Sequence, residues 1–231
     1  MCKGIFITAT GTDVGKTYIT ARIIKGLIAQ GINAGYYKAA ISGTEFETGT
    51  RIAGDAAYVF RFAGLKGDPN QAVTTLLDYP ASPHLAAQME NKSITLAPIL
   101  QDFDKAASVY DYVVMEGSGG IICPLNLEGS TLMLTDVINA LALDIVIVAD
   151  AGLGTINSTL LTLEYARSLK INTRCIVLNR FDKKSTIHCD NKKVLEAMTG
   201  LEVLVCETQG SFDILSIKKI LLAVCNNNCH L

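Results

Sequence analysis

The strongest constraint on the fold is an alternation along the chain between short apolar runs and helix-like segments. Runs rich in β-branched residues predict strands at 4–9, 33–41, 110–120 (where the strand enters a glycine-rich turn), 144–150, 173–179 and 201–207. Helical spacing of apolar residues predicts helices at 16–31, 55–63, 82–90, 96–109, 131–143, 155–170, 190–198 and 213–225. Apolar strands that alternate with helices form parallel sheets covered on both faces. We therefore predict one doubly wound α/β domain over residues 1–231, with a mainly parallel sheet.

The first predicted strand runs directly into the stretch ATGTDVGKT, residues 9–17. Its end, Gly15-Lys16-Thr17, matches a phosphate-binding loop, but Thr10 stands where the usual pattern has a glycine. The free N–H groups at the start of the following helix attract phosphate. Lys16 would reach the β- and γ-phosphates, and the Thr17 hydroxyl would bind Mg²⁺. The loop therefore predicts a P-loop NTPase-like fold with a nucleotide site.

Further candidates stand at the ends of the other predicted strands, because doubly wound sheets bind ligands at their carboxyl edge. Lys38 closes the second strand, with Ser42 four residues on; Lys38 is either a solvated strand end or a cation at the loop's rim. Glu116 closes the third strand, where ATPases with this loop place an acid near Mg²⁺, and glycine-rich residues 117–120 let backbone approach a ligand. Asp55 begins a predicted helix and is either a helix N-terminal acid or a ligand.

Two later strand ends and two histidines offer weaker signals. The stretch ADAGLGTIN, residues 149–157, is a second possible anion cradle or an ordinary strand-to-helix turn. Asn179 could recognise a base edge through its amide or cap a turn. We expect His84 and His188 to be structural or solvent-facing.

Charge and cysteine content narrow the classes of function. The formal net charge is −2, so no basic field exists to hold nucleic acid or an anionic membrane surface. Seven cysteines, an odd number without a CxxC pair, indicate a reducing, cytoplasmic setting. The tail with Cys225, Cys229 and His230 lacks the further ligands that a structural zinc site needs. No apolar run reaches the roughly 18–20 residues of a membrane-spanning helix.

Seven short blocks, taken together and in order, resemble the dethiobiotin synthetases of biotin synthesis. The family's loop reads G-T-x-T-x-V-G-K-T, so Ala9 occupies its first glycine position; the methyl group costs little if φ is negative there. The blocks span about residues 4–180 and read FITATGTDVGKT, GYYKAAISG, GDA, SPHLAAQME, VVMEGSGG, GLGTIN and VLN.

This resemblance implies a reaction. ATP, CO₂ and the vicinal diamine 7,8-diaminononanoate would give a cyclic urea, dethiobiotin, with ADP and phosphate. One amine forms a carbamate with CO₂, and the γ-phosphoryl group of ATP then moves to the carbamate oxygen. The neighbouring amine attacks this mixed anhydride and closes the ring. ATP is thus a co-substrate, and Mg²⁺ is the implied metal.

The resemblance also implies residue roles. Lys16, Lys38 and Thr12 would be catalytic, with the two lysines offsetting repulsion between carbamate and triphosphate. Thr17, Asp55 and Glu116 would hold Mg²⁺ through oxygen ligands. The diamine would contact Thr12 and Ser42. The resemblance also implies a homodimer, in which the helix start at GLGTIN of one subunit binds the substrate carboxylate of the other through Gly154, Thr155, Ile156 and Asn157. The nucleotide would contact Asp13, Val14, Gly15, Lys16, Thr17, Tyr18, Asp55, Glu116, Gly117, Ser118, Gly119, Asn179 and Arg180.

Two further departures from the family pattern concern other contacts. Family members often carry an acid-Ile-Pro turn near the adenine, where this chain reads VCETQGSF. The histidine that usually follows GLGTIN is Ser158 here.

Three other classes of nucleotide-binding protein carry related loops. ATPase domains of cobyrinate-type amidotransferases need a glutaminase domain, for which 231 residues leave no room. Regulatory ATPases that position septa or chromosomes usually have a lysine early in the loop, where TGTDV has none. A non-catalytic nucleotide-binding module is the third alternative.

Overall fold

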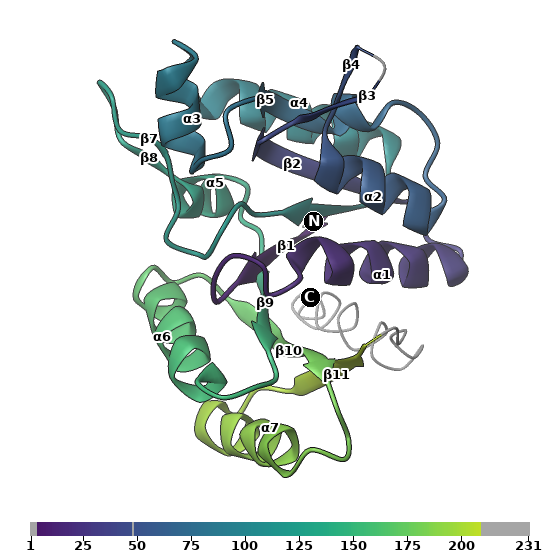
Figure 1. The fold of residues 1–231 in the computed structure, drawn as a ribbon, viewed down its shortest axis with the longest axis vertical. Helices are drawn as coiled ribbons and strands as arrows, with labels where there is room; N and C mark the ends of the chain where they lie inside the picture. The colour runs from purple at the N-terminus through teal and green to yellow at the C-terminus, as the bar shows by residue number, and fades with distance from the viewer. Residues whose placement is uncertain (1–3, 48, 209–231) are drawn as a thin grey trace, which may run out of the picture.

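A computed structural model describes residues 4–47 and 49–208. Its centre is one seven-stranded sheet in the order β11-β10-β9-β1-β6-β2-β5, and all neighbouring strands pair in parallel (Figure 1). The prediction of a mainly parallel sheet is confirmed. The strands are β1 (Gly4–Ala9), β2 (Ala34–Ser42), β5 (Val73–Leu77), β6 (Tyr112–Glu116), β9 (Ile145–Asp150), β10 (Thr173–Phe181) and β11 (Val203–Glu207).

Helices cover both faces of this sheet, so the fold is doubly wound as predicted. On one face α1 (Lys16–Ala29) and α2 (Gly54–Ala63) pack against the sheet around Ile23 and Val59. On the other face the packed helices are α3 (Pro83–Met89), α4 (Leu96–Val109), α5 (Leu134–Ala140), α6 (Thr155–Ser168) and α7 (Thr186–Thr199). Each face buries its own apolar core, which holds the strands rigidly in register.

Several short elements were not predicted. The polar stretch 42–54, for which no strand was predicted, contains a hairpin of β3 (Glu45–Glu47) and β4 (Thr50–Ile52). The helix predicted at 131–143 is shorter, because β8 (Leu132–Met133) pairs with β7 (Pro124–Asn126) before α5 begins. Strand β5, which follows the 3₁₀ turn η1 (Pro69–Ala72), is an edge strand of five residues, too short for a clear period.

Helix α7 begins at Thr186 rather than near residue 190. The Ser185 side chain accepts a hydrogen bond from the backbone N–H of His188, an N-cap that starts the helix earlier than its apolar spacing indicates. The helix predicted at 213–225, and the cysteines and histidine of the tail, lie outside the described residues.

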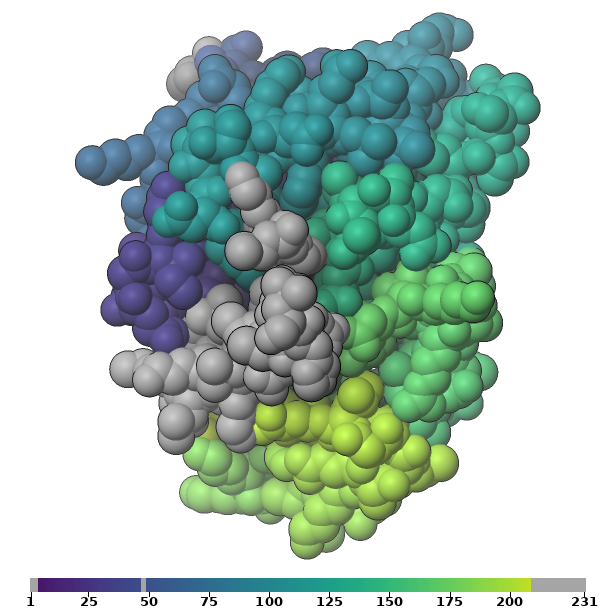
Figure 2. Space-filling view, turned by 180° about the vertical axis from the view of Figure 1, so that it is seen from behind, coloured from purple at the N-terminus to yellow at the C-terminus, as the bar shows by residue number. Residues whose placement is uncertain are grey.

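Viewed from behind, the molecule has blue and teal segments at one end and yellow-green segments at the other, with purple N-terminal residues between them (Figure 2). This follows the strand order, which places β1 at the centre of the sheet and β5 and β11 at its edges. Among the described residues, no helix is both long enough and apolar enough to cross a bilayer. Four described cysteines, at positions 123, 175, 189 and 206, are free thiols.

Candidate active site

The loop after β1 has the conformation of a strand-to-helix phosphate cradle. Gly15 is the N-cap of α1 with φ 97°, a left-handed conformation that favours glycine. A Cβ atom there would also lie 2.1 Å from Nδ2 of Asn179. Ala9 ends β1 in extended backbone and is not among the residues of positive φ, so the expectation that its methyl group costs little is met. The displaced glycine therefore leaves the loop intact.

Lys16 is the first residue of α1, and it is 8% exposed. Its ammonium donates to the carbonyl oxygen of Gly11 at 3.1 Å, which folds the side chain back over the loop. Burial, together with repulsion from Lys38, lowers the pKa of Lys16 below its ordinary value. This cation is held at an energetic cost, and an incoming anion would relieve that cost.

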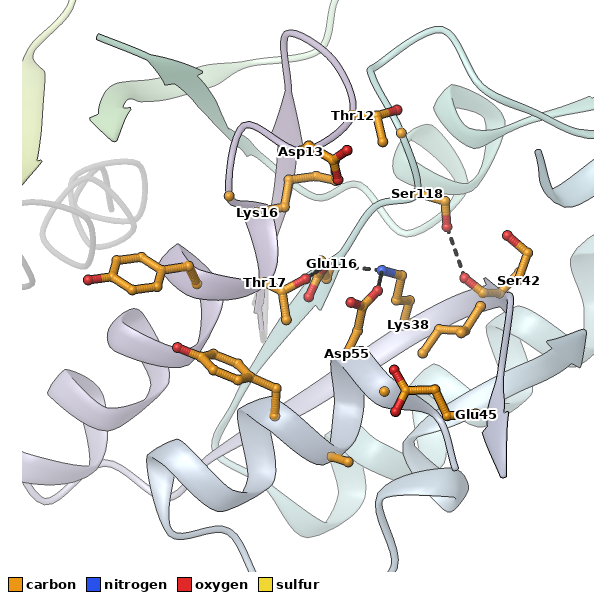
Figure 3. Close-up of a pocket in the computed structure, with 18 of the residues that line it drawn as sticks. Thr12, Asp13, Lys16, Thr17, Lys38, Ser42, Glu45, Asp55, Glu116 and Ser118 are labelled. Carbon is orange, nitrogen blue, oxygen red and sulfur yellow. Dashed lines mark hydrogen bonds and ion pairs between the residues drawn. The ribbon is translucent and has the colours of Figure 1, made fainter. Parts of the chain in front are cut away.

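Four side chains from four elements meet beside the loop (Figure 3). Nζ of Lys38 donates to Oδ2 of Asp55 at 2.6 Å and to Oε1 of Glu116 at 2.9 Å. The Thr17 hydroxyl donates to the same Oε1 at 2.7 Å. Lys38 and Glu116 are register partners on the parallel strands β2 and β6, so their side chains leave the sheet together. Asp55 approaches from the first turn of α2.

The charged side chains of this cluster are largely buried, so they interact strongly with one another and shift each other's pKa. The side chain of Glu116 is 0% exposed and that of Lys38 is 5% exposed. Burial acts against the charge of Lys38, but attraction by Glu116 and Asp55 outweighs it, and the pKa of Lys38 lies above its ordinary value. Burial likewise opposes the charge of Asp55, yet the Lys38 ammonium holds the pKa of Asp55 below its ordinary value. Lys38 is therefore a buried ammonium and not a solvated strand end.

The cluster fits a Mg²⁺ ion by the chemistry of its donors. Thr17, Asp55 and Glu116 supply one hydroxyl and two carboxylates, the hard oxygen ligands that Mg²⁺ binds. Both carboxylates already contact one cation, the ammonium of Lys38. Residues 4–47 and 49–208 contain no group of three or more His, Cys, Asp or Glu side chains able to hold a metal, and this cluster has two carboxylates.

The cluster forms one wall of a pocket with a volume of about 910 Å³. Most of the predicted site residues line it, and Figure 3 shows the loop and the strand ends converging on it. The predicted residues that line it are Thr12, Asp13, Gly15, Lys16, Thr17, Tyr18, Lys38, Ser42, Asp55, Glu116, Ser118, Gly119 and Arg180.

Seven predicted residues lie outside the lining of this pocket: Val14, Gly117, Asn179 and the four at the start of α6, residues 154–157. At Gly117 a Cβ atom would lie 2.9 Å from the Phe6 ring, so this glycine serves close packing of the core. The start of α6 follows β9, which lies on the other side of β1 from Lys38. Within one chain, the structure therefore does not bring residues 154–157 to the lysines.

Asn179 and Arg180, predicted to contact the nucleotide, brace the loop in this structure. Asn179 is 3% exposed, does not line the pocket, and donates from Nδ2 to the Val14 carbonyl at 2.9 Å. Arg180 donates to the Asp13 carbonyl and to Oδ2 of Asp150, both at 2.7 Å. The end of β10 thereby holds the loop in place through hydrogen bonds to two of its backbone carbonyls.

Sequence reasoning missed several residues of the site. Tyr36 donates its phenol hydrogen to Oε2 of Glu116 at 3.1 Å. Strand alternation could have found it, because residues 36 and 38 face the same side of β2. Glu45, Tyr58 and Arg61 also line the pocket, and no sequence signal distinguishes them, since they lie on an unpredicted hairpin and along α2.

The two histidines are away from this chemistry. Nδ1 of His188 accepts a hydrogen bond from the backbone N–H of Asp182 at 3.0 Å, and its ring lies 5.8 Å from that of Phe181. His84 is half-buried near the start of α3 and does not line the pocket. His188 is thus structural, as expected.

Known proteins resemble this chain over nearly all of its described length. A family model described as an AAA domain matches residues 3–207. An ATP-dependent dethiobiotin synthetase of Clostridium botulinum strain Alaska E43 is 49% identical over 207 residues, which is 90% of this chain and 91% of that protein. The enzyme of the same name from strain Langeland is 46% identical over 221 residues, 96% of this chain and 97% of that protein.

Solved structures share the fold at low sequence identity. A plasmid partition protein of Borrelia burgdorferi bound to AMPPNP superposes with a TM-score of 0.58 at 14% identity, covering 98% of this chain and 100% of that one. The MinD cell division protein of Aquifex aeolicus, in complex with MinC, gives a TM-score of 0.54 at 14% identity, covering 94% and 86%. These likenesses show the P-loop NTPase-like fold alone, whereas the identity to the clostridial enzymes shows the family. The chain belongs to the dethiobiotin synthetases.

Proposed function

We propose that this protein is an ATP-dependent dethiobiotin synthase, which carboxylates 7,8-diaminononanoate with CO₂ and closes the cyclic urea, releasing ADP and phosphate. The observation that carries the proposal is the buried Lys38 ammonium, 2.6 Å from Asp55 and 2.9 Å from Glu116, on the wall of the loop's pocket. A fixed cation beside a phosphate cradle suits phosphoryl transfer between two anions.

Lys38 acts as a charge and not as a base. Because its pKa is raised, it stays protonated across the neutral range. The ammonium would stabilise charge that develops as the γ-phosphoryl group moves to the carbamate oxygen. Lys16, with its lowered pKa and its place at the helix start, would bind the β- and γ-phosphates. Thr12 and Ser42, which line the same pocket, would position the carbamate and the diamine.

Mg²⁺ would be held by Thr17, Asp55 and Glu116. Bound there, the ion would neutralise phosphate charge and orient the triphosphate. Ser118 and Gly119, on the loop after β6, line the pocket at the same edge and would contact the nucleotide. Asn179 and Arg180 would contact the nucleotide base beside the loop that they brace.

The substrate carboxylate would be bound across a homodimer. Residues 154–157 lie outside their own pocket, and Gly154 opens the 14-residue helix α6 with its N–H groups free of any side-chain cap. The neighbouring Leu153 is 94% exposed, and in such a dimer it would lie next to the partner subunit. The free thiols at positions 123, 175, 189 and 206 agree with a reducing, cytoplasmic setting.

The proposed function predicts phosphate release from ATP that depends on both the diamine and bicarbonate. Release should be at background when either is omitted, and a cyclic urea should appear in equal amount to phosphate. Mass spectrometry of the product, alongside a phosphate assay, checks this. Phosphate release that ignores the diamine would instead support a regulatory ATPase, and nucleotide binding without release would support a non-catalytic module.

Changing Asp55 to asparagine should raise the Mg²⁺ concentration needed for half-maximal activity by about tenfold or more, because one hard anionic ligand is lost. Activity titrated with Mg²⁺ at saturating ATP measures this. Asp136→Asn is the matched control, since Asp136 is also in the first turn of a helix and accepts from the backbone N–H of Met133 at 2.7 Å. Equal Mg²⁺ requirements in the two variants would reduce Asp55 to a helix N-terminal acid.

A further inference from the structure

Both oxygens of the buried Glu116 carboxylate have separate partners. Oε1 accepts hydrogen bonds from Thr17 at 2.7 Å and Lys38 at 2.9 Å. Oε2 accepts from the phenol of Tyr36 at 3.1 Å. A carboxylate with its side chain 0% exposed has no solvent to satisfy it, so each donor also sets its orientation. The Tyr36 hydroxyl is the one neutral donor on Oε2 that the structure describes.

Tyr36 itself is held rigidly. It is 1% exposed and packs in the core between the sheet and helices α1 and α2. Burial, together with the negative charge of Glu116, raises the pKa of Tyr36 well above its ordinary value, so the phenol keeps its proton and remains a donor. A rigid aromatic ring therefore fixes the position of the hydrogen that Oε2 accepts.

Strand alternation separates Tyr36 from its neighbour Tyr37. Tyr36 and Lys38 leave β2 on the side of α1 and α2, whereas Tyr37 points into the other core. The Tyr37 hydroxyl donates to the backbone carbonyl of Ile99 at 2.9 Å and contacts the hydroxyl of Thr74. Two adjacent, equally buried tyrosines thus make hydrogen bonds on opposite faces of one sheet, and one of them reaches the site.

We propose that Tyr36 is a positioning residue of the site: its phenol holds Oε2 of Glu116, so that Glu116 presents only Oε1 to Thr17, Lys38 and a bound Mg²⁺. The proposal rests on the Mg²⁺ site of the proposed function. Mg²⁺ tolerates little departure from octahedral geometry, so a carboxylate restricted to one oxygen in one orientation is pre-organised for it. Without the phenol, Oε2 loses its donor and the carboxylate can turn about its last bond.

The test is the Mg²⁺ dependence of nucleotide binding, which needs no turnover. Binding of a non-hydrolysable ATP analogue is measured by calorimetry across a Mg²⁺ titration, in the wild type, Tyr36→Phe and Tyr37→Phe. Outer partners of metal ligands typically contribute about 10–100-fold to metal affinity, and we expect a shift of that size for Tyr36→Phe. Tyr37→Phe removes the hydroxyl of a tyrosine that is equally buried, 1% exposed, and this variant should titrate like the wild type.

Each outcome is decisive. A Tyr36→Phe titration that coincides with the wild type would overturn the positioning role, as would an equal shift in Tyr37→Phe or binding that does not respond to Mg²⁺ at all. Circular dichroism checks that both variants are folded. We expect both to be, because loss of the hydroxyl keeps the ring volume that packing requires. If the Mg²⁺ shift appears but the wild type releases no phosphate with the diamine, the positioning role stands and the proposed function fails.

Discussion

Replacing Lys38 with methionine should lower turnover by about two orders of magnitude or more, since one charge contact in a transition state typically contributes that much. The loss should appear in kcat as well as in KM for the diamine, because the charge acts most strongly while the phosphoryl group is in transit. Binding of ATP should stay within a few-fold of the wild type by calorimetry. Arginine should not restore activity, since its planar fork does not replace a compact ammonium in a closed space.

The same change should destabilise the fold. Glu116 would lose its cation while fully buried, and breaking a buried pair by removing one partner typically costs about 3–5 kcal/mol. Lys105→Met is the matched control, because Lys105 pairs with Asp102 at 2.7 Å on the surface with its side chain 76% exposed, where such pairs contribute roughly 1 kcal/mol or less. Urea unfolding of both variants measures the difference. Normal turnover in Lys38→Met would exclude its part in phosphoryl transfer.

The difference in unfolding free energy between the wild type and Lys38→Met should change with pH in one direction. Folding raises the pKa of Lys38, so its contribution to stability is fully present below the unfolded value of about 10.4 and is lost as pH rises through the folded value. The gap in unfolding free energy between wild type and Lys38→Met should therefore stay constant from pH 7 to 9. It should narrow only in more alkaline solution.

Replacing Lys16 with methionine should lower nucleotide-dependent turnover by about 10²–10³-fold, with weaker ATP binding, because the loop loses its phosphate-binding cation. Unlike the replacement of Lys38, the replacement of Lys16 should not lower the free energy of unfolding of the protein without nucleotide. Its pKa is lowered by burial and by repulsion from Lys38, so the folded state disfavours the charge that methionine removes. Steady-state kinetics and thermal unfolding without nucleotide separate the two effects.

The matched control for Lys16 is Lys25→Met on the same helix. Lys25 is exposed, with Nζ 4.7 Å from the centre of the Phe62 ring, and it does not line the pocket. Turnover in that variant should equal the wild type. A Lys16→Met enzyme that keeps more than about a tenth of its activity would contradict the phosphate-binding role.

Local patterns in the chain were enough to predict its main architecture. Each long apolar run that predicts a strand is a strand in the structure, and most segments with helical spacing are helices. These patterns are local, because burial of one face depends on residues only a few positions apart. The phosphate-binding loop at residues 15–17 was predictable in the same way, because a predicted strand precedes it and a predicted helix follows it. Strand β5 was missed because it is short and is stabilised by pairing with β2, more than thirty positions away. The hairpin of β3 and β4 was missed because each of its strands has only three residues, too few to show a period.

The site itself was only partly open to such reasoning. From the sequence, Lys38 and Asp55 had plausible roles as a strand end and a helix N-terminal acid, and only resemblance to the family raised them above those roles. Nothing marked Tyr36 at all. Thr17 and Glu116 meet across 99 positions and Lys38 and Glu116 across 78, so their contacts depend on strand order and register. The sequence determined which chemical groups stand at the strand ends, and the tertiary structure decided which of them share one carboxylate, because only the packed sheet brings β1, β2 and β6 side by side and removes the water between them.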